Sequence, residues 1–226
     1  MYKKIEFLFL IILLIALITV SGKMEDYVSS GAVEAKKVEV VLDPGHGASD
    51  PGKIGINQAP EKDINLKIAK KVQSRLEKEG IQVAMTREKD EMLAKESDTN
   101  KKIQDMKARV QLMNENSPKL VVSIHQNSYT DEKIHGAQVF YYAQSAEGKQ
   151  AAEIMQKALL KVDADNKRQA KANSTYYILK RTKPPTIIVE CGFLSNPEEA
   201  KLLVSDAYQE KLADAIEEGI LACLSK

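Results

Sequence analysis

Apolar runs and amphipathic stretches alternate along most of the chain, which indicates strands alternating with helices. Strands are predicted where β-branched and other apolar residues follow one another with little polar interruption. These runs lie at 38–42, 81–85, 120–124, 136–142, 176–179 and 186–189. Apolar residues that recur every three or four positions predict helices instead. These stretches lie at 61–79, 103–116, 146–162, 197–204 and 208–224.

This alternation is typical of an α/β fold with a twisted, mostly parallel sheet. The run 136–142 follows the preceding strand without a helix between them, so we expect it to be antiparallel if any strand is. The segments 48–60, 88–101 and 163–175 are polar or rich in turn-forming residues and are predicted to be loops. We therefore expect one α/β domain over residues 38–226.

The first 22 residues have the pattern of a targeting segment. Two lysines precede an apolar run over 7–20, which is shorter than the about 20 residues of a membrane span and suits the core of a signal peptide. A cleaved signal peptide over 1–22 and a retained N-terminal membrane anchor both fit this pattern. No cysteine follows the run, which excludes a lipoprotein. Residues 23–37 are polar and predict a linker, and we expect the domain to be exported.

Composition and charge narrow the function classes. The chain is 43% hydrophobic and 29% charged with a formal net charge of +1, as expected of a folded protein. It has no basic stripe interleaved with aromatic residues, so nucleic-acid binding has little support. Cys191 and Cys223 make no metal-type pair. Their spacing leaves free thiols and a disulfide open, and the lack of a cysteine framework favours free thiols.

Three of the apolar runs are each followed by a side chain that can bind a metal or transfer a proton. In VEVVLDPGHG, the strand stops at an Asp-Pro-Gly turn and His46 follows between two glycines. His125 follows the run 120–124, and Glu190 follows the run 186–189. Because the carboxyl ends of neighbouring parallel strands meet at one crevice, we expect these three side chains to converge.

Glu61, in the first turn of the first long predicted helix, adds a carboxylate to this group. Two histidines and a carboxylate with an open fourth position are the ligands of hydrolytic zinc sites, and a further carboxylate can act on the bound water. Each residue alone has an ordinary explanation, since Glu61 can stabilise a helix N-terminus and Glu190 can form an ion pair. His135 has no comparable position and is expected to be structural or exposed. The segment GHGASD lacks the third glycine of a dinucleotide-binding loop.

Four motifs together resemble a known enzyme family. VVLDPGHG, the helix-leading Glu61, SIHQNS over 123–128 and VECGFLSN over 189–196 are similar to the zinc-dependent N-acetylmuramoyl-L-alanine amidases with a type-3 amidase domain. The resemblance runs from about residue 38 to residue 224. The short domain, with one N-terminal hydrophobic segment and no wall-binding repeats, most resembles the CwlD-type amidases of spore-forming bacteria.

The resemblance implies a fold, a cofactor and residue roles. It implies a sheet of about six strands flanked by helices, in keeping with the pattern above. By this resemblance His46, Glu61 and His125 are the ligands of one zinc ion, and Glu190 is the catalytic acid and base.

The resemblance also assigns residues around this centre. Asn127 and Arg87 are expected near the substrate groove, and Arg109 matches a family arginine that we expect to be structural. Gln126 stands where the family often has alanine, which adds bulk beside a ligand without removing one.

The implied substrate is peptidoglycan, cut between the lactyl group of N-acetylmuramic acid and the L-alanine of the stem peptide. The CwlD-type resemblance implies a role in spore cortex modification, by muramic-lactam formation, and in germination. A zinc endopeptidase or carboxypeptidase acting within the stem peptide needs the same ligands and is the first alternative. A non-catalytic wall-binding domain is the second, and the presence of all four chemical groups counts against it. The domain has no wall-binding module, so we expect that an accessory protein places or activates it.

Overall fold

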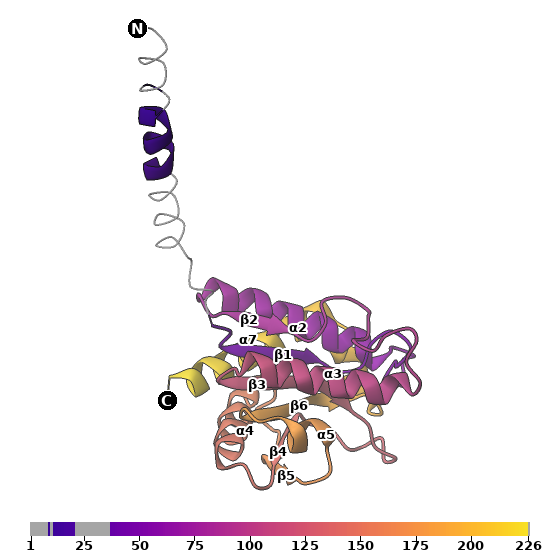
Figure 1. Cartoon of the computed structure of the whole chain (residues 1–226). Helices are drawn as coiled ribbons and strands as arrows, with labels where there is room; N and C mark the ends of the chain where they lie inside the picture. The colour runs from indigo at the N-terminus through magenta and orange to yellow at the C-terminus, as the bar shows by residue number, and fades with distance from the viewer. Residues whose placement is uncertain (1–8, 10, 21–36, 226) are drawn as a thin grey trace, which may run out of the picture. The chain divides into compact units, whose positions relative to one another are not determined.

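The computed structural model describes residues 9, 11–20 and 37–225 (Figure 1). The chain divides into an N-terminal unit, residues 1–36, and a second unit, residues 37–226. The strands of the second unit form one six-stranded sheet in the order β2-β1-β3-β6-β4-β5. The strands are β1 (Val40–Pro44), β2 (Val83–Met85), β3 (Leu120–Asn127), β4 (Gln138–Tyr142), β5 (Lys171–Asn173) and β6 (Thr186–Phe193). The helices are α2 (Glu61–Lys78), α3 (Lys101–Asn116), α4 (Ala146–Leu159), α5 (Tyr177–Arg181), α6 (Pro197–Leu203) and α7 (Asp206–Leu224).

The central strands of the sheet are parallel. β1 pairs in parallel with β2 on one side and with β3 on the other, and β3 pairs in parallel with β6. β4 is antiparallel to β6, and β5 is parallel to β4. Both the mostly parallel sheet of about six strands and the antiparallel strand without a preceding helix are thereby confirmed.

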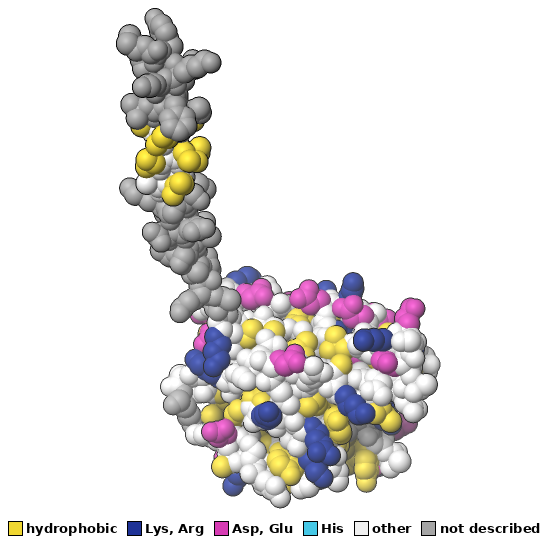
Figure 2. All heavy atoms as spheres, viewed as in Figure 1, with side chains coloured by type: hydrophobic (Ala, Val, Ile, Leu, Met, Phe, Trp, Pro, Cys, Tyr) yellow, Lys and Arg dark blue, Asp and Glu magenta, His cyan; other side chains and the backbone are white. Residues whose placement is uncertain are grey.

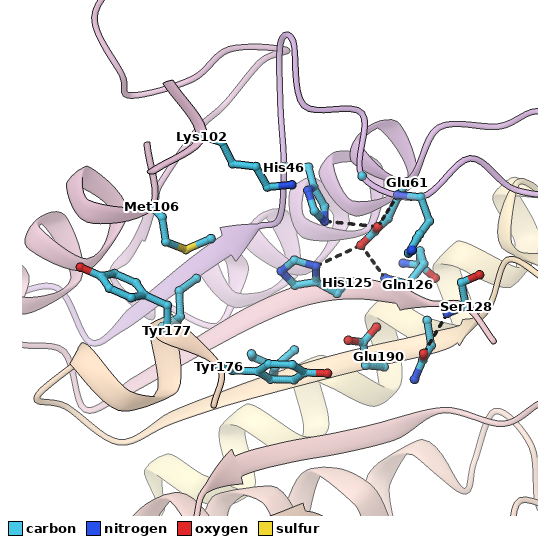
Figure 3. Close-up of a pocket in the computed structure, with 15 residues that line it drawn as sticks. His46, Glu61, Lys102, Met106, His125, Gln126, Ser128, Tyr176, Tyr177 and Glu190 are labelled. Carbon is cyan, nitrogen blue, oxygen red and sulfur yellow. Dashed lines mark hydrogen bonds and ion pairs between the residues drawn. The ribbon is translucent and has the colours of Figure 1, made fainter. Parts of the chain in front are cut away.

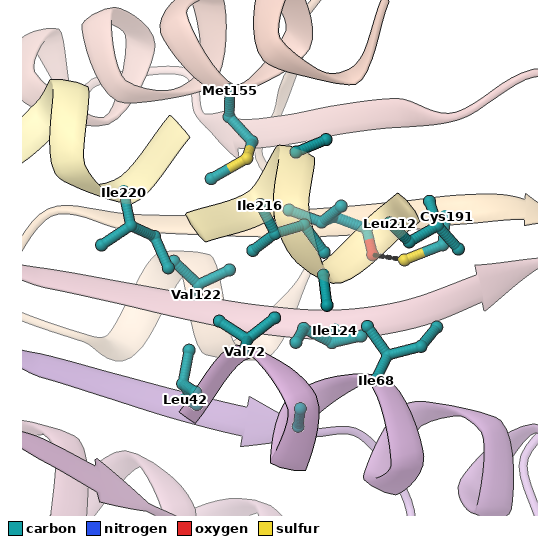
Figure 4. Close-up of a cluster of buried hydrophobic side chains, with 14 of the residues drawn as sticks. Leu42, Ile68, Val72, Val122, Ile124, Met155, Cys191, Leu212, Ile216 and Ile220 are labelled. Atoms are coloured by element: carbon teal, nitrogen blue, oxygen red, sulfur yellow. Dashed lines mark hydrogen bonds between the residues drawn. The ribbon is translucent and has the colours of Figure 1, made fainter. Parts of the chain in front are cut away.

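Helices cover both faces of the sheet. Because successive side chains of a strand point to opposite faces, Val40 and Leu42 join the core formed with α2, α4 and α7, whereas Val41 joins the core formed with α3 and α5. Figure 4 shows Val72 of α2 and Ile216 of α7 on the first of these faces. Burial on both faces explains why the parallel strands are nearly continuous apolar runs in the sequence.

Two predicted elements are wrong. The apolar run predicted as a strand at 176–179 forms the short helix α5. Just before α5, the backbone amides of Thr175 and Tyr176 donate to the side chain of Asn173. These bonds turn the chain away from the extended direction. The predicted loop 163–175 contains β5, which pairs with the edge of β4 and carries no apolar alternation because its side chains are largely exposed.

The N-terminal unit is described only in part. Residues 9 and 11–20 are helical, while the rest of the predicted targeting segment, with the linker up to residue 36, lies outside the described residues. Among the residues described, no helix combines the length and the apolar character needed to cross a bilayer.

Basic and acidic side chains are interspersed on the face of the domain shown in Figure 2. This mixture is what the near-balanced composition, with a formal net charge of +1, leads us to expect.

Candidate metal centre and active site

Three neighbouring strands bring the predicted side chains to one edge of the sheet. His46 follows the end of β1, while His125 and Glu190 lie opposite each other in β3 and β6. Both of these strands continue beyond the apolar runs, so His125 and Glu190 lie within strands rather than after them. The register between β3 and β6 shifts just beyond this pair, between His125 and Asn127. Such bulges are frequent beside active sites, where they redirect side chains.

The Glu61 carboxylate lies between the two histidines. Its Oε2 is 3.2 Å from His46 Nε2, and its Oε1 is 3.0 Å from His125 Nδ1 (Figure 3). The backbone amides of Lys53 and Gln126 also donate to this carboxylate, at 2.8 and 3.1 Å. These contacts fix Glu61 at the first position of α2, where only 2% of the residue is exposed.

Asp50 holds the ring of His46 from its other side. The Asp50 Oδ2 oxygen lies 2.8 Å from His46 Nδ1, so a neutral ring that donates there presents an Nε2 lone pair toward Glu61. This pairing of carboxylate, histidine and cation is usual around metal ligands, because the outer carboxylate sets the tautomer. No role was predicted for Asp50 from the sequence, although it lies only four residues beyond His46.

The donor set fits a divalent metal ion. The ligand atoms of His46, Glu61 and His125 all lie within 4.8 Å of one another. His46 Nε2 lies 3.2 Å from the buried Glu61 carboxylate, so a cation bound between the two can contact both. Two imidazoles and one carboxylate are ligands that zinc accepts. The three residues assigned from the sequence are therefore the ones that the fold gathers.

Two glycines make room for the ligands. A Cβ on Gly45 would lie 2.1 Å from the ring of His125, and a Cβ on Gly52 would lie 2.5 Å from Glu61 Oε2. Gly52 also has a φ of +70°, which side chains rarely adopt. His46 itself has a φ of 64°, a strained value for a residue other than glycine. The backbone around DPGHG is thus shaped to bring His46 and His125 against Glu61.

Burial and the neighbouring charges have opposite effects on the pKa values of Glu61 and His125. Burial opposes ionisation of Glu61, but hydrogen bonds with His125 and His46 outweigh it and hold the pKa of Glu61 well below its usual range. Burial also opposes protonation of His125, yet the Glu61 carboxylate raises the pKa of His125 to about 9. Glu61 is therefore an anion that attracts positive charge to the place between the rings.

Glu190 has different surroundings. It is buried beside the ligand set, and its Oε2 has no hydrogen-bond partner in the part of the chain that the structure describes. Burial raises the pKa of Glu190 to about 7, the charge of His125 opposes this rise, and the nearby Glu61 carboxylate adds to it. A carboxyl group with such a pKa can both accept and return a proton near neutral pH.

The raised pKa of Glu190 can be measured in the metal-free protein. We expect one glutamate carboxyl to titrate with a pKa of about 7, so that it is protonated below this pH, and we expect its carbon NMR signal to be absent in Glu190→Gln. Adding zinc should lower the pKa, because a nearby positive charge favours the carboxylate. If all glutamate carboxyls of the metal-free protein titrate in the normal range, the assigned surroundings of Glu190 are wrong.

The ligand set and Glu190 line one cavity of about 480 Å³. Asn127, predicted to lie at the substrate groove, also lines it. In Figure 3 the opposite wall carries Met106, Tyr176 and Tyr177, and Lys102 extends over His46. No strand-end pattern points to these four residues, since Lys102 and Met106 belong to α3 and the two tyrosines belong to a run predicted as a strand.

Comparison with known proteins identifies the chain. Residues 40–222 match the family described as N-acetylmuramoyl-L-alanine amidase. The chain belongs to this amidase family. A germination-specific N-acetylmuramoyl-L-alanine amidase of Bacillus subtilis (strain 168) is 40% identical over 185 residues, which cover 80% of this chain and 78% of that protein.

Solved amidase structures share the fold. The CwlD amidase from Clostridioides difficile, in complex with the GerS lipoprotein, has a TM-score of 0.80 and 39% identity over 83% of this chain and 98% of that chain. The amidase AmiC2 of Nostoc punctiforme has a TM-score of 0.74 and 32% identity over 84% of this chain and 98% of that chain. The similarity to CwlD-type amidases that the motifs indicated is confirmed.

Arg87 of this amidase, expected near the substrate groove, is not among the residues that line the cavity. Only 2% of Arg87 is exposed. Its guanidinium donates to the backbone carbonyls of Pro44, Gly45, Lys62 and Lys89. Burial and a neighbouring arginine lower the pKa of Arg87 to about 10, so it remains charged at neutral pH. These bonds link the loop after β1 to the start of α2 and leave few donors for a substrate.

Arg109 supports the amidase site from the α3 side, as its expected structural role requires. It forms buried ion pairs with Asp43 at 2.8 Å and Asp105 at 2.7 Å, and it donates to the backbone carbonyl of His46 at 2.7 Å. Asp43 also accepts from two buried hydroxyl groups. Burial opposes its ionisation, but these partners hold the pKa of Asp43 below its usual range.

Removing this arginine should destabilise the amidase strongly. We expect Arg109→Ala to lower the free energy of unfolding by about 3–5 kcal/mol, because it leaves the buried Asp43 charge without its partner. Urea denaturation measures the change. Lys107→Ala, at an exposed position of the same helix, should change it by no more than about 0.5 kcal/mol. Equal stabilities for the two variants would contradict a structural role for Arg109.

Proposed function

We propose that this chain is a zinc-dependent amidase that hydrolyses the bond between the lactyl group of N-acetylmuramic acid and the L-alanine of the stem peptide. The observation that carries the proposal is the position of Glu190, a buried carboxyl with a pKa of about 7 beside a cation-binding set of two histidines and a carboxylate. Membership of the amidase family supports the choice of bond.

His46, Glu61 and His125 hold the zinc ion in this proposal. Zinc, when bound, supplies Lewis-acid chemistry that polarises a carbonyl and makes water more acidic. Asp50 keeps the Nε2 lone pair of His46 directed toward the ion through its contact at 2.8 Å. The rigid turn around Gly45 and the buried Glu61 keep the ligands in place as a substrate enters.

Glu190 transfers the protons. Its carboxylate accepts a proton from the attacking water, and the protonated group then donates this proton to the alanine nitrogen as that nitrogen leaves. A pKa of about 7 suits both steps, since neither protonation state is strongly disfavoured at neutral pH. Asn127 at the cavity wall contacts the substrate.

The biological setting follows from the relatives. The 40% identity to a germination-specific amidase and the similarity to a CwlD amidase support action on the spore cortex, by removal of peptides ahead of muramic-lactam formation. The predicted targeting segment supports action outside the cytoplasm, as a secreted or a membrane-anchored enzyme. The CwlD structure contains a lipoprotein partner, which supports an accessory protein for this chain too.

The bond that is cut tests the proposal. The zinc-loaded full chain should release from peptidoglycan stem peptides that begin with L-alanine, together with peptide-free muramic acid, as identified by mass spectrometry. Fragments cut within the stem peptide would instead establish an endopeptidase or carboxypeptidase. Binding to peptidoglycan with no product would point to a non-catalytic role.

A further inference from the structure

Two lysines belong to the lining of the active-site cavity. Lys53 lies in the loop before α2, and Lys102 lies in the first turn of α3. Figure 3 shows Lys102 reaching over the cavity toward His46. The mechanism proposed above uses neither ammonium group, so both lysines are available for another role in this cavity.

Both lysines retain hydrogen-bonding capacity. Lys102 Nζ lies 3.1 Å from Asp50 Oδ1, yet 66% of the Lys102 side chain is exposed. Lys53 is exposed, and its ammonium makes no hydrogen bond or ion pair within the described part of the chain. An ammonium has three donors, so each group can bind an acceptor that enters the cavity.

The acidic groups in the cavity lining do not neutralise these lysines. The Glu61 carboxylate is occupied by His46, His125 and two backbone amides. Glu190 is buried, and no hydrogen bond or ion pair joins it to either lysine in the described part of the chain. Asp50 accepts from Lys102 at 3.1 Å, and an ammonium with three donors has two left, so both lysines can attract an anion into the cavity.

We propose that Lys53 and Lys102 bind a free carboxylate of the stem peptide and make the enzyme selective for substrates that carry it. This inference rests on the proposed amidase function. The second residue of a stem peptide is a glutamate joined through its side-chain carboxyl, so its α-carboxyl is either a free anion or an amide. That group lies roughly 7 Å beyond the scissile bond in an extended peptide. The cavity that contains the ligands and both lysines has a volume of about 480 Å³, which has room for this length of peptide.

Charge gives the selectivity. A hydrogen bond between an ammonium and a carboxylate is about twice as strong as one between neutral groups. An amidated glutamate offers only a neutral oxygen and also brings an NH₂ group that two ammonium groups cannot accept from. Lys53 and Lys102 therefore favour the anionic peptide over its amide.

The test compares two soluble substrates, muramyl tripeptides with a free or an amidated glutamate α-carboxyl. The zinc-loaded full chain should prefer the free carboxylate by about 10-fold or more in kcat/KM, as expected for an ion pair that the amide cannot form. Lys53→Gln should lower this preference, and Lys53→Gln combined with Lys102→Gln should reduce it to about two-fold. Lys101→Gln, an exposed neighbour outside the cavity lining, is the matched control and should keep the preference.

Each outcome has a defined meaning. Zinc content and circular dichroism are measured for all variants, and Lys53→Gln has no side-chain contact with the ligands whose loss could lower zinc content. Equal cleavage of the two substrates by the unmodified enzyme, or a preference kept in the double variant, overturns the lysine proposal and leaves the amidase function intact. Cleavage of neither substrate by the unmodified enzyme counts against the proposed function and against this inference with it.

Discussion

Glu190→Gln is expected to lower kcat on peptidoglycan by about 10²–10⁴-fold, the range typical of a lost general acid or base. The amide side chain has nearly the same shape but cannot accept a proton from water. Because Glu190 is not one of the grouped ligand residues, the variant should retain zinc and the folded structure. Turnover is measured by release of free L-alanine amino groups, and zinc by atomic absorption.

Glu198→Gln serves as the control for this variant, since Glu198 is an exposed glutamate close by in the chain. It should keep normal kcat and normal zinc content. Near-normal turnover by Glu190→Gln would remove Glu190 from the reaction. Loss of zinc together with activity would show instead that Glu190 is a ligand.

The second large effect is expected from the proposed ligands. His46→Ala or His125→Ala should weaken zinc binding by more than about 100-fold, because loss of an outer partner alone costs about 10–100-fold. Activity should fall with zinc occupancy. The structural reason is that each ring supplies one nitrogen to the group of atoms within 4.8 Å around Glu61.

His135→Ala is the matched control for the histidine variants. His135 is exposed and lies outside the ligand group, so its replacement should leave zinc affinity and activity unchanged. Unchanged zinc affinity in His46→Ala or His125→Ala would exclude that residue from the metal centre, whatever happens to activity.

The sequence allowed the sheet and the centre of the site to be predicted for the same physical reason. Strands buried on both faces must be continuous apolar runs, so they stand out from their surroundings. A polar side chain directly after such a run lies at the edge where α/β folds bind ligands. This rule predicted the positions of His46, His125 and Glu190. Glu61 was predicted from its place in the first turn of the first long helix.

Other features depend on contacts that sequence patterns do not contain. The Tyr-Tyr-Ile-Leu run has strand-like composition, yet it forms α5 after an Asn173 turn. From the sequence, Arg87 was expected near the substrate groove. In the structure its guanidinium donates to backbone carbonyls at the end of β1, in the loop that follows and in the first turn of α2. Lys53 and Lys102 are ordinary exposed lysines in the sequence, and only the folding of two separate segments places them at one cavity.

The most direct test of the account is hydrolysis of a muramyl tripeptide in water labelled with oxygen-18, followed by mass spectrometry of both products. Attack of water on the lactyl carbonyl predicts one labelled oxygen in the carboxylate of muramic acid and none in the released peptide. Label in a carboxyl group of the peptide, with the muramyl–alanine amide intact, would contradict the account.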